Sequence, residues 1–246
     1  MSLANVVDLR TTGAKDESGV ANGAWFYQNS SQPTGTGFYD PFLRLQDSPV
    51  EEAFNTDYRS NGQAPLDAKS DPNYTHSMTL GSLQVVTKKG INFYAFSLDI
   101  DEPNSGAKRY ISLDQVKIYL ASSPTLADLS TATLKWDMDG AGDATVYLDG
   151  GALSPGNGAD DMQMLVPVSF FAGADPNSYV YFYSKLGATA NMGADNYDAN
   201  ASFEEWRALR NQNPPPPTIA EPTTMTLLGV GIASLARARR RKPEIT

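Results

Sequence analysis

The amino-acid sequence predicts an all-β protein, an antiparallel β-sandwich for which jelly-roll connectivity is one option. Three observations predict it: short apolar runs alternate with turn-forming residues over residues 6–183, aromatic residues make up 10% of the chain, and helical patterns are scarce. β-Branched and aromatic residues favour strands, whereas Gly, Pro, Asn and Ser favour the turns between them. A chain of 246 residues is long enough to bury one sizeable core.

The strands are expected where the apolar runs fall. These runs cover residues 24–27, 42–45, 83–86, 91–100, 116–120, 145–148, 164–168 and 179–183. In the fourth run Tyr94, Phe96, Leu98 and Ile100 recur at every second position, so we expect them on one buried face of a strand. The fifth run repeats this pattern. About eight to ten strands at this spacing are typical of a sandwich.

Turn chemistry separates the runs. Residues 32–37, 101–106 and 149–151 are rich in Gly, Pro, Asp and Ser, residue types that adopt or pre-set the backbone angles of tight turns. At residues 202–210 two interpretations remain open. Ser202 followed by Glu205 has the form of a helix capping box, but the same stretch also fits a last strand.

Charge and residue types exclude several classes of protein. The net charge is −9 and the isoelectric point is about 4.6, which argues against a general nucleic-acid binder, because binding to the phosphate backbone needs an excess of clustered cations. It has no cysteine, which rules out disulfides, thiolate metal sites and cysteine nucleophiles. His76 is the single histidine, so a metal centre built from several histidines is excluded too.

A calcium site is the best candidate for bound metal. Asp137, Asp139 and Asp143 fall in the Gly-rich segment 137–143, and closely spaced carboxylates in a tight loop suit a hard cation such as Ca²⁺. The segment departs from an EF-hand loop because Ala141 replaces an oxygen donor and no Glu stands at the twelfth position. The alternative is a polar hairpin between residues 134–136 and 146–148, in which Asp and Gly simply form the turn.

Paired acids beside aromatic residues invite comparison with glycosidases, which use two carboxylates across the scissile bond. Neighbouring residues such as Glu204 and Glu205 point in different directions, so this pair cannot provide that geometry alone. We therefore expect Phe203 and Trp206 to anchor the core and the glutamates to be solvated. The same holds for Glu51 and Glu52 beside Phe54, and we expect no enzymatic activity and no catalytic residue.

The composition changes near residue 211. Residues 211–221 contain four consecutive prolines and form an extended linker, so we expect a sandwich domain at 1–210 and a tail at 222–246. The tail reads as a polar hinge with Glu221 and Pro222, an uncharged apolar helix at 225–236, and a basic cluster. Cations of this kind stay on the cytoplasmic side of a membrane. The cluster includes Arg237, Arg239, Arg240 and Arg241.

This tail resembles the PEP-CTERM sorting signal, with Ala220-Glu221-Pro222 in place of its Pro-Glu-Pro signature. Segments 36–46, 54–57, 112–120, 158–162 and 203–206 are also similar to recurrent segments of proteins that carry this signal. The resemblance implies recognition by an exosortase of a Gram-negative bacterium, transient anchoring in the inner membrane, and a destination at the cell surface or in the extracellular matrix.

The expected function is that of an exported structural or interaction protein. An exopolysaccharide-binding module, assisted by Ca²⁺ or not, is the alternative, in which Trp25, Tyr27 or Tyr39 would stack on sugar rings. A secreted hydrolase is a further alternative. Residues 1–9 lack the basic start and apolar stretch of a secretory signal peptide, so we expect that signal to be encoded upstream of Met1.

Overall fold

The computed structural model describes residues 5–28, 37–103, 105–152, 160–189, 195–200 and 202–211. All of them belong to one compact unit, Met1–Pro215. The second unit, Pro216–Thr246, lies outside the described residues, and so do the predicted linker beyond residue 211, the apolar helix and the basic cluster. Within the described part of the chain, no helix is both long and apolar enough to cross a membrane.

Two seven-stranded sheets form the body of the protein, which confirms the predicted all-β sandwich. The first sheet has the order β1-β11-β9-β13-β5, with β10 added to β9 and β6 added to β13. Its strands are β1 (Asn5–Asp8), β5 (Glu51–Phe54), β6 (Met78–Thr79), β9 (Tyr110–Ala121), β10 (Thr133–Asp137), β11 (Ala144–Asp149) and β13 (Tyr179–Leu186). Neighbouring strands of this sheet are antiparallel except for the parallel pair β1 and β11.

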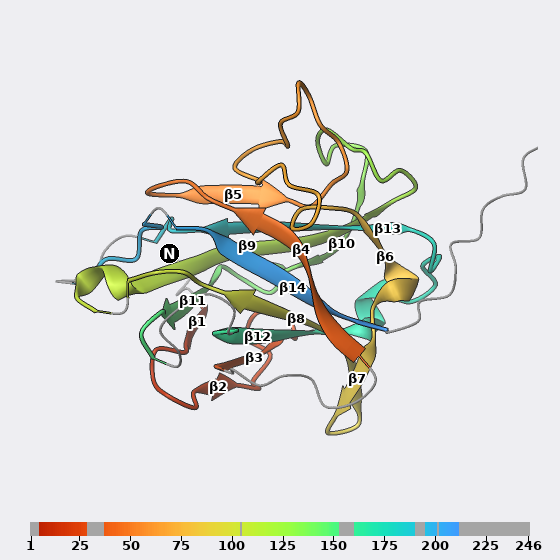
Figure 1. Cartoon of the computed structure of the whole chain (residues 1–246). Coiled ribbons are helices and arrows are strands. Elements are labelled where there is room, and N and C mark those ends of the chain that lie inside the picture. Colours follow the sequence, from red (N-terminus) through yellow and green to blue (C-terminus); the bar gives the residue numbers. More distant parts are fainter. Residues whose placement is uncertain are drawn as a thin grey trace, which may run out of the picture. The chain divides into compact units, whose positions relative to one another are not determined.

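The second sheet has the order β2-β3-β12-β8-β14-β4, with β7 paired to β8. Its strands are β2 (Lys15–Asp16), β3 (Trp25–Gln28), β4 (Gly37–Leu45), β7 (Val85–Lys88), β8 (Ile91–Asp99), β12 (Met162–Pro167) and β14 (Glu204–Asn211). Figure 1 shows β12, β8, β14 and β4 following one another across this sheet. Three short 3₁₀-helices join strands: η1 (Leu80–Ser82), η2 (Ala107–Arg109) and η3 (Val168–Phe171).

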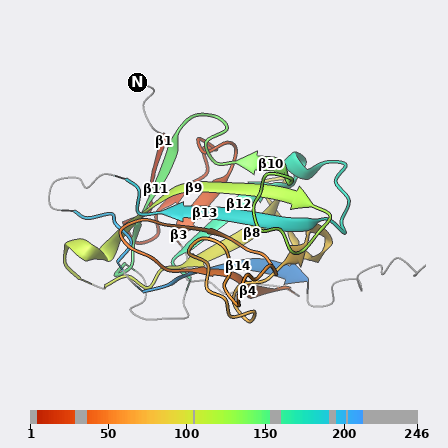
Figure 2. The same ribbon diagram turned by 90° about the horizontal axis from the view of Figure 1, so that it is seen from above.

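From β8 onward the chain alternates between the sheets, as it does in jelly rolls. It passes from β8 in the second sheet to β9–β11 in the first, then to β12, β13 and β14 in turn. Figure 2 shows β9 and β13 side by side in one layer and β14 beside β4 in the other. Strands that are distant in the sequence therefore become neighbours, and this brings the functional side chains described below together.

The core lies between the two sheets and is rich in aromatic rings. Phe182 of β13 is in contact with rings from the opposite sheet, at centroid distances of 5.0 Å to Phe96 and 4.7 Å to Trp206. Tyr94, Phe96 and Leu98 of β8, and Ile100 just after it, all belong to this core, which confirms the predicted face. Phe93 and Ala95, the sequence neighbours of Tyr94, enter a second apolar cluster, because successive side chains of a strand point to opposite faces.

The stretch at 202–210 forms a strand, so the capping-box interpretation is wrong. β14 pairs with β8 on one side and with β4 on the other. Two hydrogen-bonded neighbours satisfy the backbone of this segment, whereas a helix of about nine residues would be marginal on its own. Trp206 is fully buried, as expected of a core anchor.

Segments 133–137 and 144–149 do not form the polar hairpin considered from the sequence. β10 and β11 do not pair with each other; both pair antiparallel with β9. β10 faces residues 117–120 of β9, and β11 faces residues 110–113. The two strands thus lie one after the other beside the same neighbour, and the Asp-rich segment between them bulges out of an interrupted strand.

Candidate functional site

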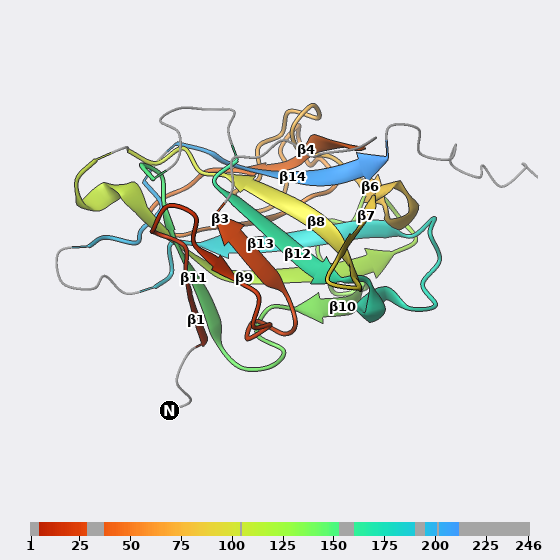
Figure 3. The ribbon, with the colours of Figure 1, turned by 90° about the horizontal axis from the view of Figure 1, so that it is seen from below.

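Acidic side chains from several strand ends gather at one end of the sandwich. β8 ends at Asp99, next to Glu205 near the start of β14 in the register of the two strands. The backbone amide of Asp161, just before β12, donates to the carbonyl of Leu98 at 2.9 Å. Figure 3 shows β8 ending on the side where β12 and β14 begin. Glu51, the first residue of β5, joins them from the first sheet and interacts with Glu204.

Arginines neutralise one part of this acidic end. Arg207 of β14 lies 3.0 Å from Asp160, 3.0 Å from Asp99 and 2.8 Å from Glu205. Arg44 of β4 binds the other oxygen of Glu205 at 2.5 Å. Three buried carboxylates thus share two guanidinium groups in an ion network across β4, β14 and β8. Charge-assisted hydrogen bonds of this kind orient side chains precisely where water is excluded.

Glu51, Glu102 and Glu204 form the other part of the acidic end, and their charged neighbours differ from those of the ion network. All three are buried, yet the charged groups that act most strongly on them are other acids. Burial raises the pKa of Glu51 to about 7 and that of Glu102 to about 8, and it holds the pKa of Glu204 well above its usual range. Loss of solvation disfavours the charged form of a carboxyl group, so these groups hold protons near neutral pH.

Asp161 is a fourth buried acid without a guanidinium partner in the described residues. One of its oxygens accepts the backbone amide of Ile100 at 2.9 Å. Burial raises the pKa of Asp161 to about 8, and the nearby carboxylates of Asp99, Asp160 and Asp149 add to this effect. Asp149 itself is paired with Arg109.

The structure corrects the expectation that the paired glutamates are solvated. Glu51, Glu204 and Glu205 are buried, and only Glu52 is partly exposed. Glu205 is buried because Arg44 and Arg207 bind its two oxygens in place of water, and Glu51 and Glu204 are buried in contact with each other. The sequence carries only a weak signal for this arrangement: acids begin β5 and β14, end β8, and directly precede β12.

The predicted calcium site lies elsewhere, in the bulge between β10 and β11. Both oxygens of Asp139 accept hydrogen bonds from within the protein, from the backbone amide of Ala144 and the side chain of Gln115, each at 3.0 Å. Asp137 accepts the amide of Asp139 and lies 3.5 Å from Lys117. The backbone carbonyl of Asp143 accepts from Asn5. The carboxylates of Asp137 and Asp139 thus bond to groups in and beside the bulge, and Ca²⁺ binding there stays a prediction.

In the described ranges no three His, Asp or Glu side chains already stand together in a metal-binding arrangement. The predicted sorting residues Glu221, Pro222, Arg237, Arg239, Arg240 and Arg241 lie outside those ranges.

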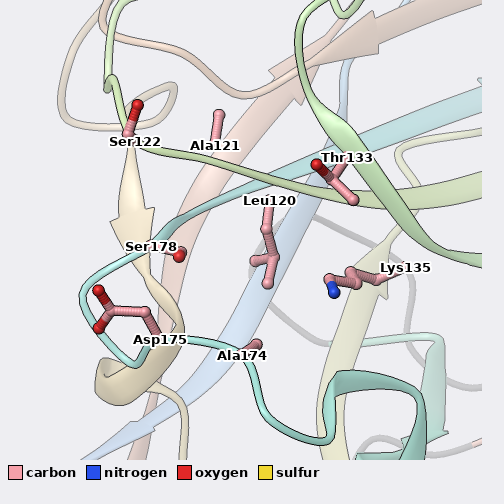
Figure 4. Close-up of a pocket in the computed structure, with 8 residues that line it drawn as sticks. All are labelled: Leu120, Ala121, Ser122, Thr133, Lys135, Ala174, Asp175 and Ser178. Atoms are coloured by element: carbon pink, nitrogen blue, oxygen red, sulfur yellow. The ribbon is translucent and has the colours of Figure 1, made fainter.

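A shallow pocket of about 280 Å³ lies where β9 and β10 approach the loop before β13 (Figure 4). Its lining includes Leu120, Thr133, Lys135, Asp175 and Ser178. It is at the lower limit of ordinary ligand pockets, which are about 300–1,000 Å³. It contains one carboxylate and one amine and none of the buried acids.

The aromatic residues considered for sugar stacking lie in or beside the second apolar cluster. Trp25 is buried there against Phe93, with ring centroids 4.8 Å apart. Tyr27 and Tyr39 are partly buried and pack against the same cluster. The amine of Lys88 lies 3.9 Å from the centroid of the Tyr27 ring, so a protein cation already takes the face that a sugar would need.

Comparison of the chain with protein-family models, curated proteins and solved structures finds no match.

Proposed function

We propose that this chain is an exported, non-enzymatic protein of the bacterial cell surface or extracellular matrix, delivered there by exosortase processing of its tail. The observation that carries the proposal is the order of parts in the tail: the hinge with Glu221 and Pro222, the apolar stretch 225–236, and the basic cluster 237–242. Such cations halt transfer and remain in the cytoplasm, so residues before them would lie outside the membrane.

The organisation of the body supports the same proposal. β14 is paired with β8 as far as Ala208 and with β4 as far as Asn211, the first residue of the predicted Pro-rich linker. The two sheets and their common core are therefore built from residues that precede the prolines of the linker. A sandwich that completes its sheets before a semi-rigid spacer is suited to projection from a surface, and also to release by cleavage in the tail.

The hydrolase alternative has less support from the structure. Glycoside hydrolysis generally needs two carboxylates placed across the scissile bond. The pocket at β9 and β10 offers only Asp175. The acids of the strand ends are buried, and those nearest Arg207 are held in ion pairs.

The polysaccharide-binding alternative would require open aromatic rings. Trp25 is buried and Lys88 lies over Tyr27, which leaves the partly buried Tyr39 as the remaining candidate of the three. A solution binding assay against polysaccharide from the host, with and without a chelator, tests this alternative. Binding that is lost on Tyr39→Ala would favour it over a purely structural role.

The sorting proposal is tested by the intact mass of the protein recovered from fractions of the native host, with and without its exosortase. We expect a surface or medium form that ends before Met225, and its loss in the exosortase mutant. A Glu221→Ala/Pro222→Ala variant should remain full length, while the body variant Lys89→Ala should be processed normally. A full-length form in the cytoplasm or inner membrane of the wild-type host, still carrying residues 237–242, would overturn the proposal.

A further inference from the structure

We propose that Glu51, Glu102 and Glu204 form a binding site for a divalent cation of the calcium class at the acidic end of the sandwich. The three residues come from different parts of the fold. Glu51 opens β5 in the first sheet, Glu204 opens β14 in the second, and Glu102 lies in the connection that leaves β8. A cation bound by all three would tie the two sheets together.

Each of these three residues has one buried side-chain oxygen without a hydrogen-bond donor in the described part of the chain. Exposed fractions are 0% for Glu51, 5% for Glu102 and 1% for Glu204. One oxygen of Glu51 accepts the amide of Asp47 at 3.1 Å, and one oxygen of Glu102 accepts the amide of Asn200 at 2.9 Å. Within the described residues, Glu51 Oε1, Glu102 Oε2 and Glu204 Oε1 are buried and have no hydrogen-bond donor. Buried polar atoms normally have a partner, so three unpartnered oxygens in one cluster point to a missing positive group.

The contact between Glu51 and Glu204 gives the same indication. Their carboxyl groups lie within hydrogen-bonding reach of each other. Two ionised carboxylates can only accept hydrogen bonds, so this contact is favourable only when a proton or a cation lies between them. The neighbouring acids Asp67 and Asp101 make ionisation of Glu51 and Glu204 without a bound proton or cation still less favourable.

The donor chemistry selects the class of cation. The site offers carboxylate oxygens and neither nitrogen nor sulfur, which favours hard cations over zinc or copper. Ca²⁺ accepts six to eight oxygens in irregular geometry, whereas Mg²⁺ demands a near-ideal octahedron and keeps several waters. A buried site lined by glutamate carboxylates therefore suits Ca²⁺ better. Since the acids do not yet stand in a ligating arrangement, binding requires rotation of their side chains about χ angles that long residues adjust easily.

The test is thermal unfolding of the full chain with Ca²⁺, Mg²⁺ or a chelator, together with calorimetric titration of Ca²⁺. Near pH 8 and at about 100 times the Kd we expect Ca²⁺ to raise the Tm by roughly 5 °C or more. Near pH 5 the effect should vanish, because protons occupy the carboxyl groups. Glu204→Gln should weaken Ca²⁺ binding by at least about 100-fold, consistent with loss of a charged ligand.

Two matched variants locate the effect. Glu52→Gln changes the partly exposed neighbour of Glu51 and should leave the Ca²⁺ response intact. Asp139→Asn, in the bulge between β10 and β11, should also leave it intact. Glu204→Gln keeps the size of the protonated glutamate side chain and, like it, carries no charge, so the variant should remain folded without Ca²⁺ and its lost response is not a folding defect.

Each contrary outcome overturns the proposal. If Ca²⁺ near pH 8 gives neither heat in the calorimetric titration nor a shift of the Tm, shared protons alone neutralise the three glutamates. A response lost in Asp139→Asn but kept in Glu204→Gln would place the cation in the bulge. An equal response to Mg²⁺ would refute the calcium class.

Discussion

Arg207 offers the sharpest test of how the acidic end is held together. Its side chain is 17% exposed and binds Asp99, Asp160 and Glu205. In the variant Arg207→Met the apolar stem is largely kept and the guanidinium is lost. Arg44 still neutralises Glu205, but Asp99 and Asp160 lose the ion pairs that Arg207 provides.

The expected loss of stability follows from burial. Removing one partner of a buried ion pair costs about 3–5 kcal/mol, because the remaining charge stays buried without compensation. In a domain of this size each kcal/mol lowers the Tm by about 2–4 °C, so we expect a fall of roughly 10 °C near neutral pH. The control is Lys89→Met, which removes an exposed ion pair to Glu17. Exposed pairs contribute at most about 1 kcal/mol.

The pH dependence separates lost charge compensation from lost packing. Burial raises the pKa of Asp160, and Arg207 opposes that rise. Without Arg207 the pKa of Asp160 in the folded state rises further above the pKa of Asp160 in the unfolded state. The stability that protonated Asp160 contributes is therefore present at low pH and is lost as the pH rises through the folded-state pKa. The deficit of the variant should therefore shrink as pH falls toward about 4. Urea unfolding at several pH values measures it, and a deficit under about 1 kcal/mol, or one independent of pH, would refute the reasoning.

Three further predictions concern other buried positions. Asn55→Ala should cost about 3–5 kcal/mol in urea unfolding, since Asn55 bonds a buried amide at 2.6 Å and two backbone carbonyls; a cost below about 1 kcal/mol would show these bonds to be dispensable. Gly187→Ala should lower the Tm strongly, because its φ is +79° and a Cβ would clash with the carbonyl oxygen of Pro49, whereas Gly62→Ala, with open space around it, should cost only about 1 kcal/mol; equal losses would contradict the clash. Asp161→Asn should stabilise the protein increasingly from about pH 4 to the pKa of about 8, and a gain that is constant with pH would show that charge is not its source.

The strands that the sequence predicts best are those with a long apolar period. β8 and β9 span nine and twelve residues, and their buried faces follow directly from the alternation of side chains. The sequence pattern does not reveal the short strands β2 and β6, because two residues are too few to show a period. Their pairing depends on neighbours brought by the fold, such as β13 for β6.

The nature of segment 204–211 could not be decided locally. Glu204 and Glu205 before Trp206 fit both a helix start and a strand, and the deciding factor is hydrogen bonding to β4 and β8. β4 lies about 160 residues earlier in the chain, as the register of Leu45 with Glu204 shows. Tertiary context of this kind overrides local preference.

The candidate site is even harder to predict from the sequence than the nature of segment 204–211. Residue type alone assigns Glu and Asp to the surface, since these residues are rarely buried without a partner. Glu51, Glu102 and Glu204 are nevertheless buried, and no local pattern specifies that β5, β8 and β14 bring them to one end. Only the alternation of the chain between the two sheets makes these distant acids neighbours.

The positions of the acidic residues in the fold change how the net negative charge of the sequence is interpreted. A net charge of −9 reads as a property of the surface, but many of the acids are inside. The buried acids are Glu51, Asp99, Glu102, Asp149, Asp160, Asp161, Glu204 and Glu205, and in the described ranges no Lys or Arg is buried to the same degree. Arg44, Arg109 and Arg207 compensate part of this charge.

The remainder must be neutralised from solution, by protons or by a bound cation, because an isolated buried carboxylate is too costly to persist. Folding of this chain is therefore coupled to the uptake of positive charge. The free energy of unfolding must then depend on pH, and the cation site that we propose would add a dependence on Ca²⁺ at the strand ends where Glu51 of the first sheet meets Glu204 of the second. In the exported protein that we propose, such coupling would make the closure of this end sensitive to the medium outside the cell.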